Sequence, residues 1–207
     1  MYILRSKAMN DKVSGGRFVF RAKRVFDFIL ALFLASALSP LLLMIALIVK
    51  FTSAGPALYW SDRVGVDNQI FRMPKFRSMQ IDAPQVATHL LTSPDTYLTP
   101  IGSFIRRSSI DELPQLWSIL TGDLSFVGPR PALFNQNDLI DLRTAVGVHK
   151  LIPGLTGWAQ INGRDDLSIQ VKVAYDREYL GRQSFVFDIQ VLWLTALKIL
   201  RSDGIHH

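Results

Sequence analysis

The feature that most constrains this chain is an uncharged apolar run from Phe28 to Val49, bounded by Asp27 and Lys50. The run is 22 residues long, and a helix of about 20 apolar residues can cross the hydrocarbon core of a bilayer. Near its centre, however, lies the dipeptide Ser39-Pro40. Proline inside a helix removes one hydrogen bond and clashes with the preceding turn. The run therefore predicts a membrane helix with a sharp break.

Two membrane arrangements fit this break. The first is a kinked helix that spans the bilayer, since proline is fairly frequent in spanning helices. The second is a re-entrant helix-break-helix, in which the Ser39 hydroxyl helps to satisfy the backbone and the chain returns to the side it came from. Each arm, 28–38 and 41–51, measures about 16 Å, roughly half of the hydrocarbon core. Basic residues on both sides of the run favour the second arrangement, but the residues alone leave both open.

Positive charge is concentrated around this run. The net charge is +6, and residues 1–50 hold 8 Lys/Arg against 2 acids, whereas residues 51–207 hold 15 of each. Juxtamembrane cations are attracted to anionic head groups, so the basic balance predicts contact with membrane lipids. It argues against nucleic-acid binding, which would place the charge on the folded domain. The absence of cysteine excludes a disulfide scaffold, a cysteine nucleophile and a thiolate metal site.

The pattern divides the chain into three parts. Residues 1–16 are interpreted as an N-terminal tail, 17–53 as the membrane helix pair, and 54–207 as one small domain at the membrane surface. The expected fold class is α+β and mostly helical, with a short β-hairpin and interfacial amphipathic helices beside the membrane element. The terminal residues His206-His207 are interpreted as a tag remnant.

Within the domain, residues 57–79 predict a β-hairpin that turns at Asp67-Asn68. Helices are expected in three places: one or two within 102–124, one over 132–145 and one over 168–180. The last is predicted to bury a face with Val171, Ala174, Tyr175 and Tyr179. The apolar segment 184–200 predicts either an interfacial helix with Trp193 at head-group level or an ordinary buried helix.

One acidic pair, Asp111-Glu112, is the candidate site, and it allows two interpretations. Its spacing from Ser109 matches a capping box, in which case both acids only stabilise a helix start. Alternatively the pair is catalytic, because an aspartate can attack phosphorus and a neighbouring glutamate can hold Mg²⁺. Magnesium needs few protein ligands when diphosphate oxygens supply the rest.

Several cations near this pair in sequence, or held in rigid loops, could bind phosphate groups. The segment GPRP is the clearest case, because Pro129 and Pro131 fix the backbone on both sides of an arginine. Pairing with surface acids is the alternative for each cation taken singly. The candidates are Lys75, Arg77, Arg106, Arg130 and Arg164.

Four segments, taken in chain order, resemble the successive motifs of the bacterial sugar transferase family. Its members are the monotopic phosphoglycosyl transferases, or polyprenyl-phosphate sugar-1-phosphate transferases. The segments are KRVFDFILALFLASALSPLLLMIALIVK, RVGVDNQIFRMPKFRSM, SSIDELPQLWSILTGDLSFVGPRP and PGLTGWAQINGR. The match covers about residues 20–200. The chain is similar to the small, catalytic-core members of the bacillosamine-phosphate transferase type.

The resemblance implies a re-entrant helix broken at Ser39-Pro40 and a catalytic domain on the cytoplasmic face of the bacterial inner membrane. It implies that Asp111 attacks the β-phosphate of a UDP-sugar, that UMP leaves, and that polyprenyl (undecaprenyl) phosphate takes the phosphosugar from the aspartate. This would be the first membrane step of glycoconjugate assembly. Glu112 would hold Mg²⁺, and Lys75, Arg106 and Arg130 would contact phosphates.

The chain departs from the family pattern beside the nucleotide pocket but not at the acid pair. Pro74 stands where the family often has tyrosine, and YWSDRVG replaces a more usual aromatic-x-Gln-x-Arg pattern. Two other functions remain as alternatives: a non-enzymatic membrane-anchored scaffold, and a glycosyltransferase that releases UDP. The sequence does not identify the sugar or the pathway, and it leaves the oligomeric state open, a homodimer included.

Overall fold

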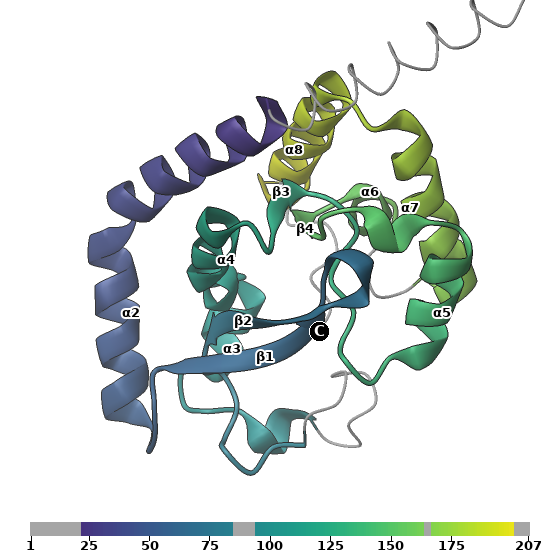
Figure 1. The fold of residues 1–207 in the computed structure, drawn as a ribbon. Helices are drawn as coiled ribbons and strands as arrows, with labels where there is room; N and C mark the ends of the chain where they lie inside the picture. Colours follow the sequence, from purple (N-terminus) through teal and green to yellow (C-terminus); the bar gives the residue numbers. More distant parts are fainter. Residues whose placement is uncertain (1–21, 85–93, 164–166, 201–207) are drawn as a thin grey trace, which may run out of the picture.

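The computed structural model describes residues 22–84, 94–163 and 167–200. In Figure 1 the helix Ala22–Ala37 and α2 form an arc along one side of the domain, the β1–β2 hairpin lies near the centre, and α5 and α7 lie on the opposite side. The longer elements are α2 (Ser39–Thr52), β1 (Leu58–Val64), β2 (Ile70–Phe76), α5 (Asn137–Ala145), α7 (Ile169–Arg182) and α8 (Phe185–Leu200). The shorter ones are the 3-10 helices η1 (Val66–Asn68), η3 (Pro94–Tyr97), η4 (Ile110–Gln115) and η5 (Val148–Lys150), the helices α3 (Gly102–Arg107), α4 (Leu116–Thr121) and α6 (Trp158–Ile161), and the strands β3 (Ser125–Val127) and β4 (Gly154–Thr156). This mostly helical α+β architecture confirms the predicted fold class.

The predicted break lies between Ala22–Ala37 and α2, which meet at a bend of 63°. Pro40 falls in the first turn of α2, where a missing N–H is tolerated. In a continuous helix the N–H of residue 40 would donate to the carbonyl of Ser36. The Ser39 hydroxyl donates to that carbonyl instead, at 2.8 Å. Among the described residues no single helix has the length and apolar content of a membrane span, whereas this bent pair has both.

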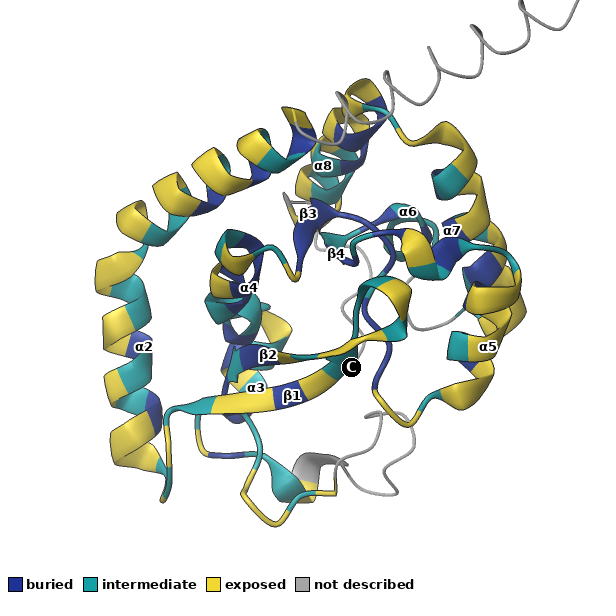
Figure 2. Cartoon of the chain, in the orientation of Figure 1, coloured by how far each residue is buried: buried dark blue, intermediate teal, exposed yellow. Residues whose placement is uncertain are grey.

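The two sides of the bent pair differ in burial (Figure 2). Residues on the inner side, Ala31 on the first arm and Ile45 and Val49 on the second, are at most 4% exposed. Both arms thus pack against the same domain. The exposed side includes many large apolar residues: Val25, Phe28, Ile29, Leu32, Phe33, Leu43, Met44, Leu47 and Phe51. A continuous apolar surface of this kind is unusual on a monomeric soluble protein.

The predicted hairpin is present. Strands β1 and β2 pair antiparallel, from Leu58 opposite Phe76 to Val64 opposite Ile70. Asp67 and Asn68 both adopt left-handed conformations, with φ of 51° and 60°, which aspartate and asparagine tolerate better than other non-glycine residues. A second, two-stranded sheet joins β3 and β4 in parallel.

The predicted helix over 168–180 forms as α7; of the predicted face Tyr179 is buried, but Val171 and Ala174 are not. The buried positions are Val173, Asp176 and Tyr179. Polar atoms on the buried face have partners inside the protein: the Tyr179 hydroxyl donates to Asp188 Oδ1 at 2.6 Å and to the Val127 carbonyl at 3.2 Å. Because a hydrophobic periodicity assigns aspartate to the surface, it selected the neighbouring stripe.

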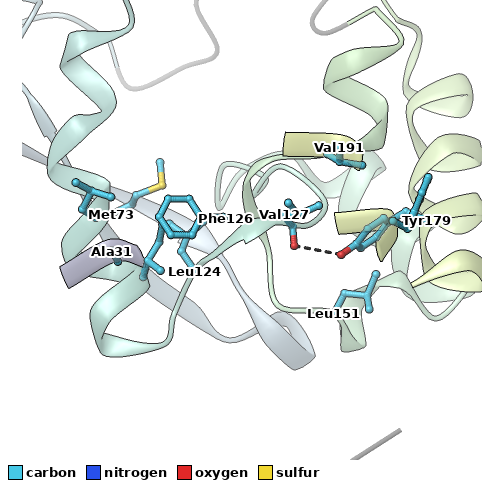
Figure 3. Close-up of a cluster of buried hydrophobic side chains, with 11 residues drawn as sticks. Ala31, Met73, Leu124, Phe126, Val127, Leu151, Tyr179 and Val191 are labelled. Carbon is cyan, nitrogen blue, oxygen red and sulfur yellow. Dashed lines mark hydrogen bonds between the residues drawn. The ribbon is translucent and has the colours of Figure 1, made fainter. Parts of the chain in front are cut away.

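The core joins the first arm of the bent pair to the domain. Ala31 belongs to the same buried cluster as Phe126, Val127, Tyr179 and Val191, and Figure 3 shows these side chains with the bond between Tyr179 and Val127. α8 is buried on one face only, and a position of Trp193 at lipid head groups stays a prediction. One face, with Phe187 and Val191, is buried, and the other exposes Val186, Trp193 and Ile199.

Two cations expected at lipid head groups lie inside the protein instead. Lys23 is 6% exposed; its Nζ lies 2.5 Å from Asp188 Oδ2 and donates to the Val127 carbonyl at 3.0 Å. Arg24 donates to the carbonyls of Ile119 and Leu120 at the end of α4. A buried ammonium needs a counter-ion, and the carboxylate that supplies it comes from α8.

Candidate active site

The candidate site is built around the Glu112 carboxylate. Lys75 Nζ and Arg130 Nη2 both bind its Oε1 atom, at 2.7 Å and 2.8 Å. The three residues come from different parts of the chain: Lys75 from β2, Glu112 from η4, and Arg130 from the loop after β3. The structure thus brings together an acid and two of the cations that the sequence singled out separately.

The capping-box interpretation of Ser109 and Glu112 is wrong. Ser109 is left-handed, with φ of 55°, and its side chain makes no capping bond. Only the backbone joins the two residues, through the Glu112 N–H and the Ser109 carbonyl at 3.2 Å. The Glu112 carboxylate is directed at cations instead. A non-glycine residue in a left-handed conformation costs on the order of 1–3 kcal/mol, and such strain is concentrated at functional sites.

The two acids differ in electrostatic state. Burial, together with the neighbouring Glu112 charge, raises the pKa of Asp111 to about 6, against the attraction of Lys75 and of the nearby arginines. For Glu112 burial also opposes ionisation, but Arg130 and Lys75 outweigh it and hold the pKa well below its usual range. The pKa values of these two adjacent carboxyls therefore lie far apart: Glu112 stays ionised, and Asp111 gains or loses its proton near pH 6. Separated pKa values of this kind are typical of acid pairs with distinct catalytic roles.

The loop that carries Arg130 is held by its carbonyl groups. Proline has no N–H, so Pro129 and Pro131 leave the carbonyls as the main backbone anchors. The Pro129 carbonyl accepts from the Gly154 N–H at 2.9 Å. The Arg130 carbonyl accepts from Arg143 Nη1 at 2.8 Å, and that of Pro131 from Arg63 Nη1 at 3.3 Å. β4, α5 and β1 thus each bind one carbonyl of the loop.

Glycine is required where this loop meets β4. A Cβ atom on Gly154 would lie 2.1 Å from the Gly128 backbone nitrogen, so no other residue fits without moving the strand. The motifs GPRP and PGLTG therefore form one unit, although they are separate in sequence. Pro74, the departure noted beside Lys75, is tolerated in β2 because, in the described part of the chain, this strand pairs with β1 alone.

The other predicted cations differ in their environment. Arg106, in α3, is close enough to lower the Asp111 pKa by charge attraction. Arg77 is directed elsewhere: its guanidinium donates to the Ser53 carbonyl and hydroxyl and to the Ala54 carbonyl, beyond the end of α2. The structure thus places Arg77 on the connection between the bent helix pair and the domain. Arg164 lies outside the described residues.

Sequence reasoning missed one pair beside the site. Arg143 binds Asp176 Oδ2 through Nε at 2.9 Å and Nη2 at 2.6 Å. Both side chains are at most 9% exposed. No short motif joins them, because they are 33 positions apart. The available signal was an aspartate at a helical spacing from Val173 and Tyr179, on an otherwise apolar stripe.

The described residues contain no group of three or more His, Cys, Asp or Glu side chains that could hold a metal ion. The donor set at the site is the carboxylate pair Asp111 and Glu112. Hard carboxylate oxygens suit Mg²⁺, which is commonly bound by one or two carboxylates together with substrate phosphates. The residues present thus fit a magnesium ion that arrives with a diphosphate.

Comparison with known proteins identifies the family. The model described as "Bacterial sugar transferase" matches residues 18–202. The UDP-glucose:undecaprenyl-phosphate glucose-1-phosphate transferase of Escherichia coli is 40% identical over 188 residues, 85% of this chain and 39% of the relative. The undecaprenyl-phosphate galactose phosphotransferase of Salmonella typhimurium is 36% identical over 88% of this chain and 41% of its own length. The exopolysaccharide production protein ExoY of Sinorhizobium fredii is 34% identical over 88% of this chain and 87% of its own length.

The chain thus spans less than half of the two longer relatives and most of the shorter one. The matched residues include the bent helix pair, the acid pair with Lys75 and Arg130, and the strands that flank the Arg130 loop. The chain belongs to the bacterial sugar transferase family.

Proposed function

We propose that this protein transfers a hexose-1-phosphate from a UDP-sugar to polyprenyl phosphate through a covalent phosphosugar on Asp111. The observation that carries the proposal is the arrangement of the acid pair: Asp111 is 8% exposed, and beside it Glu112 is bound by Lys75 and Arg130. The names of the relatives support the substrate class, since they specify glucose and galactose carried to undecaprenyl phosphate. A role in exopolysaccharide assembly follows the name of the shorter relative.

The reaction proceeds in two steps. An Asp111 oxygen attacks the β-phosphorus of the UDP-sugar, the bond from this phosphorus to the UMP oxygen breaks, and UMP leaves. The phosphate oxygen of the lipid then attacks the same phosphorus, and the bond to Asp111 breaks to restore the carboxylate. A nucleophile of this kind divides one difficult transfer into two easier ones.

The cations neutralise charge during both steps. Lys75 and Arg130 lie where diphosphate oxygens could take the place of the Glu112 carboxylate, and Arg106 is close enough to Asp111 to act on its charge. Arginine and lysine fixed where negative charge develops lower the barrier of phosphoryl transfer. Glu112 would hold Mg²⁺, which would shield the charge of the diphosphate from the attacking Asp111 carboxylate.

The bent helix pair is proposed as a re-entrant membrane element that places the domain on the cytoplasmic face of the bacterial inner membrane. Both arms pack on one domain, through Ala31 and through Ile45 and Val49, which supports a re-entrant path in which the start of the first arm and the end of the second lie on the same side of the membrane. With a bend of 63° shared equally by both arms, α2 would descend roughly 11 Å. This depth lies within one leaflet of a core about 30 Å thick.

The decisive experiment supplies UDP-glucose or UDP-galactose to detergent-solubilised protein without lipid. One UMP per protein should be released, and the intact mass should increase by one hexose phosphate. Polyprenyl phosphate should then remove the adduct, and Asp111→Asn should form none. Release of UDP would favour the glycosyltransferase alternative, and no nucleotide turnover with either sugar would favour the scaffold.

A further inference from the structure

We propose that Arg143, held by Asp176, is a positioning residue that sets the location of the Arg130 guanidinium in the active site. The inference rests on the proposed function, because it assigns Arg130 to the transferred phosphate. Arg143 lies in α5 and Asp176 in α7, and neither contacts the acid pair through any bond found in the described residues. Their effect on the reaction would pass entirely through the Arg130 backbone.

The geometry forms a continuous chain of contacts. Asp176 Oδ2 accepts from Nε and Nη2 of Arg143, which fixes the plane of the guanidinium. The remaining nitrogen, Nη1, donates to the carbonyl of Arg130 at 2.8 Å. The Arg130 side chain then reaches Glu112 Oε1 at 2.8 Å. All three nitrogen positions of Arg143 are therefore used, two to hold it and one to hold the loop.

The Arg143 bond acts on the backbone of Arg130. Its neighbours on both sides are prolines, which contribute no N–H donor. The adjoining carbonyls are bound by Gly154 and Arg63, so the Arg130 carbonyl would lose its side-chain donor if Arg143 were absent. The Arg130 side chain itself is 37% exposed, and packing alone does not hold it. The hydrogen bond from Arg143 to the Arg130 carbonyl thus helps to fix the backbone position from which the Arg130 side chain extends.

A structural role alone explains this pair poorly. Burying an ion pair has a large desolvation penalty, and well-packed apolar side chains of similar volume often stabilise a protein equally well or better. Lysine in place of Arg143 could neutralise Asp176 but could not also hold the Arg130 carbonyl with a fixed planar fork. The arginine is the residue type that does both.

The test replaces the ion pair without leaving a buried charge. Arg143→Met/Asp176→Leu should unfold at nearly the same temperature as the parent protein, while kcat for UMP release falls about 10- to 100-fold, as expected for a misplaced catalytic group. KM for the UDP-sugar should change much less. Asp141→Asn, which removes an exposed carboxylate from the same helix, should keep the parent kcat.

A double-mutant cycle separates positioning from stability. In an Arg130→Ala background the replacement of Arg143 and Asp176 should cause no further loss of kcat, because the effect passes through Arg130. An equal loss in both backgrounds, or an unchanged kcat in the parent background, would overturn the positioning role. If the double variant does not fold, Arg143→Lys replaces it in the same cycle and the same two outcomes decide. Normal kcat for Arg130→Ala alone would instead count against the proposed function.

Discussion

Replacing Asp111 with asparagine should stabilise the folded protein while abolishing its chemistry. Burial raises the Asp111 pKa from 3.8 to about 6, and each pKa unit corresponds to about 1.4 kcal/mol. The folded protein therefore binds a proton at Asp111 more tightly than the unfolded chain does. At pH 8, where the carboxyl is ionised in both states, ionisation costs the fold about 3 kcal/mol. Asparagine has nearly the same shape and no charge, so it should recover most of this free energy.

The sign of the pH dependence follows from the direction of the shift. The stabilising contribution of a protonated Asp111 is fully present below pH 3.8 and is lost as the pH rises through about 6. The variant should thus exceed the parent protein in stability at pH 8, and the difference should disappear near pH 4. Activity should depend on pH in the opposite direction, because only the ionised carboxylate attacks phosphorus. Single-turnover UMP release should rise about tenfold per pH unit below pH 6 and level off above it.

The assay is thermal unfolding in detergent at pH 8 and pH 4.5, with Asp141→Asn as a control for loss of an exposed charge. For a chain of this length, 1 kcal/mol shifts Tm by about 2–4 °C, so Asp111→Asn should raise Tm at pH 8 by up to about 10 °C. An unchanged or lower Tm at pH 8 would refute the reasoning, as would a gain that persists unchanged at pH 4.5. Either result would show that burial of the Asp111 carboxylate does not lower the stability of the fold as its raised pKa predicts.

Three further predictions address the rest of the site and the membrane element. Glu112→Gln should have the opposite effect to Asp111→Asn and lower Tm at pH 8, because Lys75 and Arg130 lose their counter-charge. It should also raise the Mg²⁺ concentration needed for half-maximal UMP release. Turnover should stop in excess chelator and return with added Mg²⁺; full activity in chelator would contradict a metal at the acid pair. Cysteines introduced at Lys12 and Thr52 should both react with a maleimide added on the cytoplasmic side. After Ser39→Ala/Pro40→Leu the two cysteines should react from opposite sides of the membrane. Reaction from opposite sides without these substitutions would exclude the re-entrant element.

Much of the fold could be predicted because its signals are local. Ser39-Pro40 in an apolar run predicted the break, and Asp67-Asn68 between alternating residues predicted the hairpin. Each signal depends on a few adjacent residues, and the structure adds only the geometry. For the site, sequence reasoning selected Lys75, Glu112 and Arg130 as candidates, but it could not show that they share one oxygen atom.

What could not be predicted depends on contacts between distant segments. Lys23 was expected at lipid head groups, and its partner Asp188 lies 165 positions away on α8. Arg77 was expected at a phosphate and binds the carbonyls that follow α2. A single sequence gives the charge of a side chain but not the chain segment that it meets. For this reason cations were recognised as important while their individual roles were assigned incorrectly or left open.

These long-range contacts also explain why a membrane element and a phosphate site belong to one folding unit. Arg24 binds the last carbonyls of α4, the helix that follows η4 and its acid pair. On the other arm, Val49 packs in one cluster with Phe76, the residue next to Lys75 in β2. The second arm thus packs beside the strand that carries Lys75, and the first arm holds the helix that directly follows the acid pair. In the proposed function a polyprenyl phosphate is confined to the membrane surface, so the helix pair that would set the depth of the domain would also set the depth at which Asp111 meets the lipid.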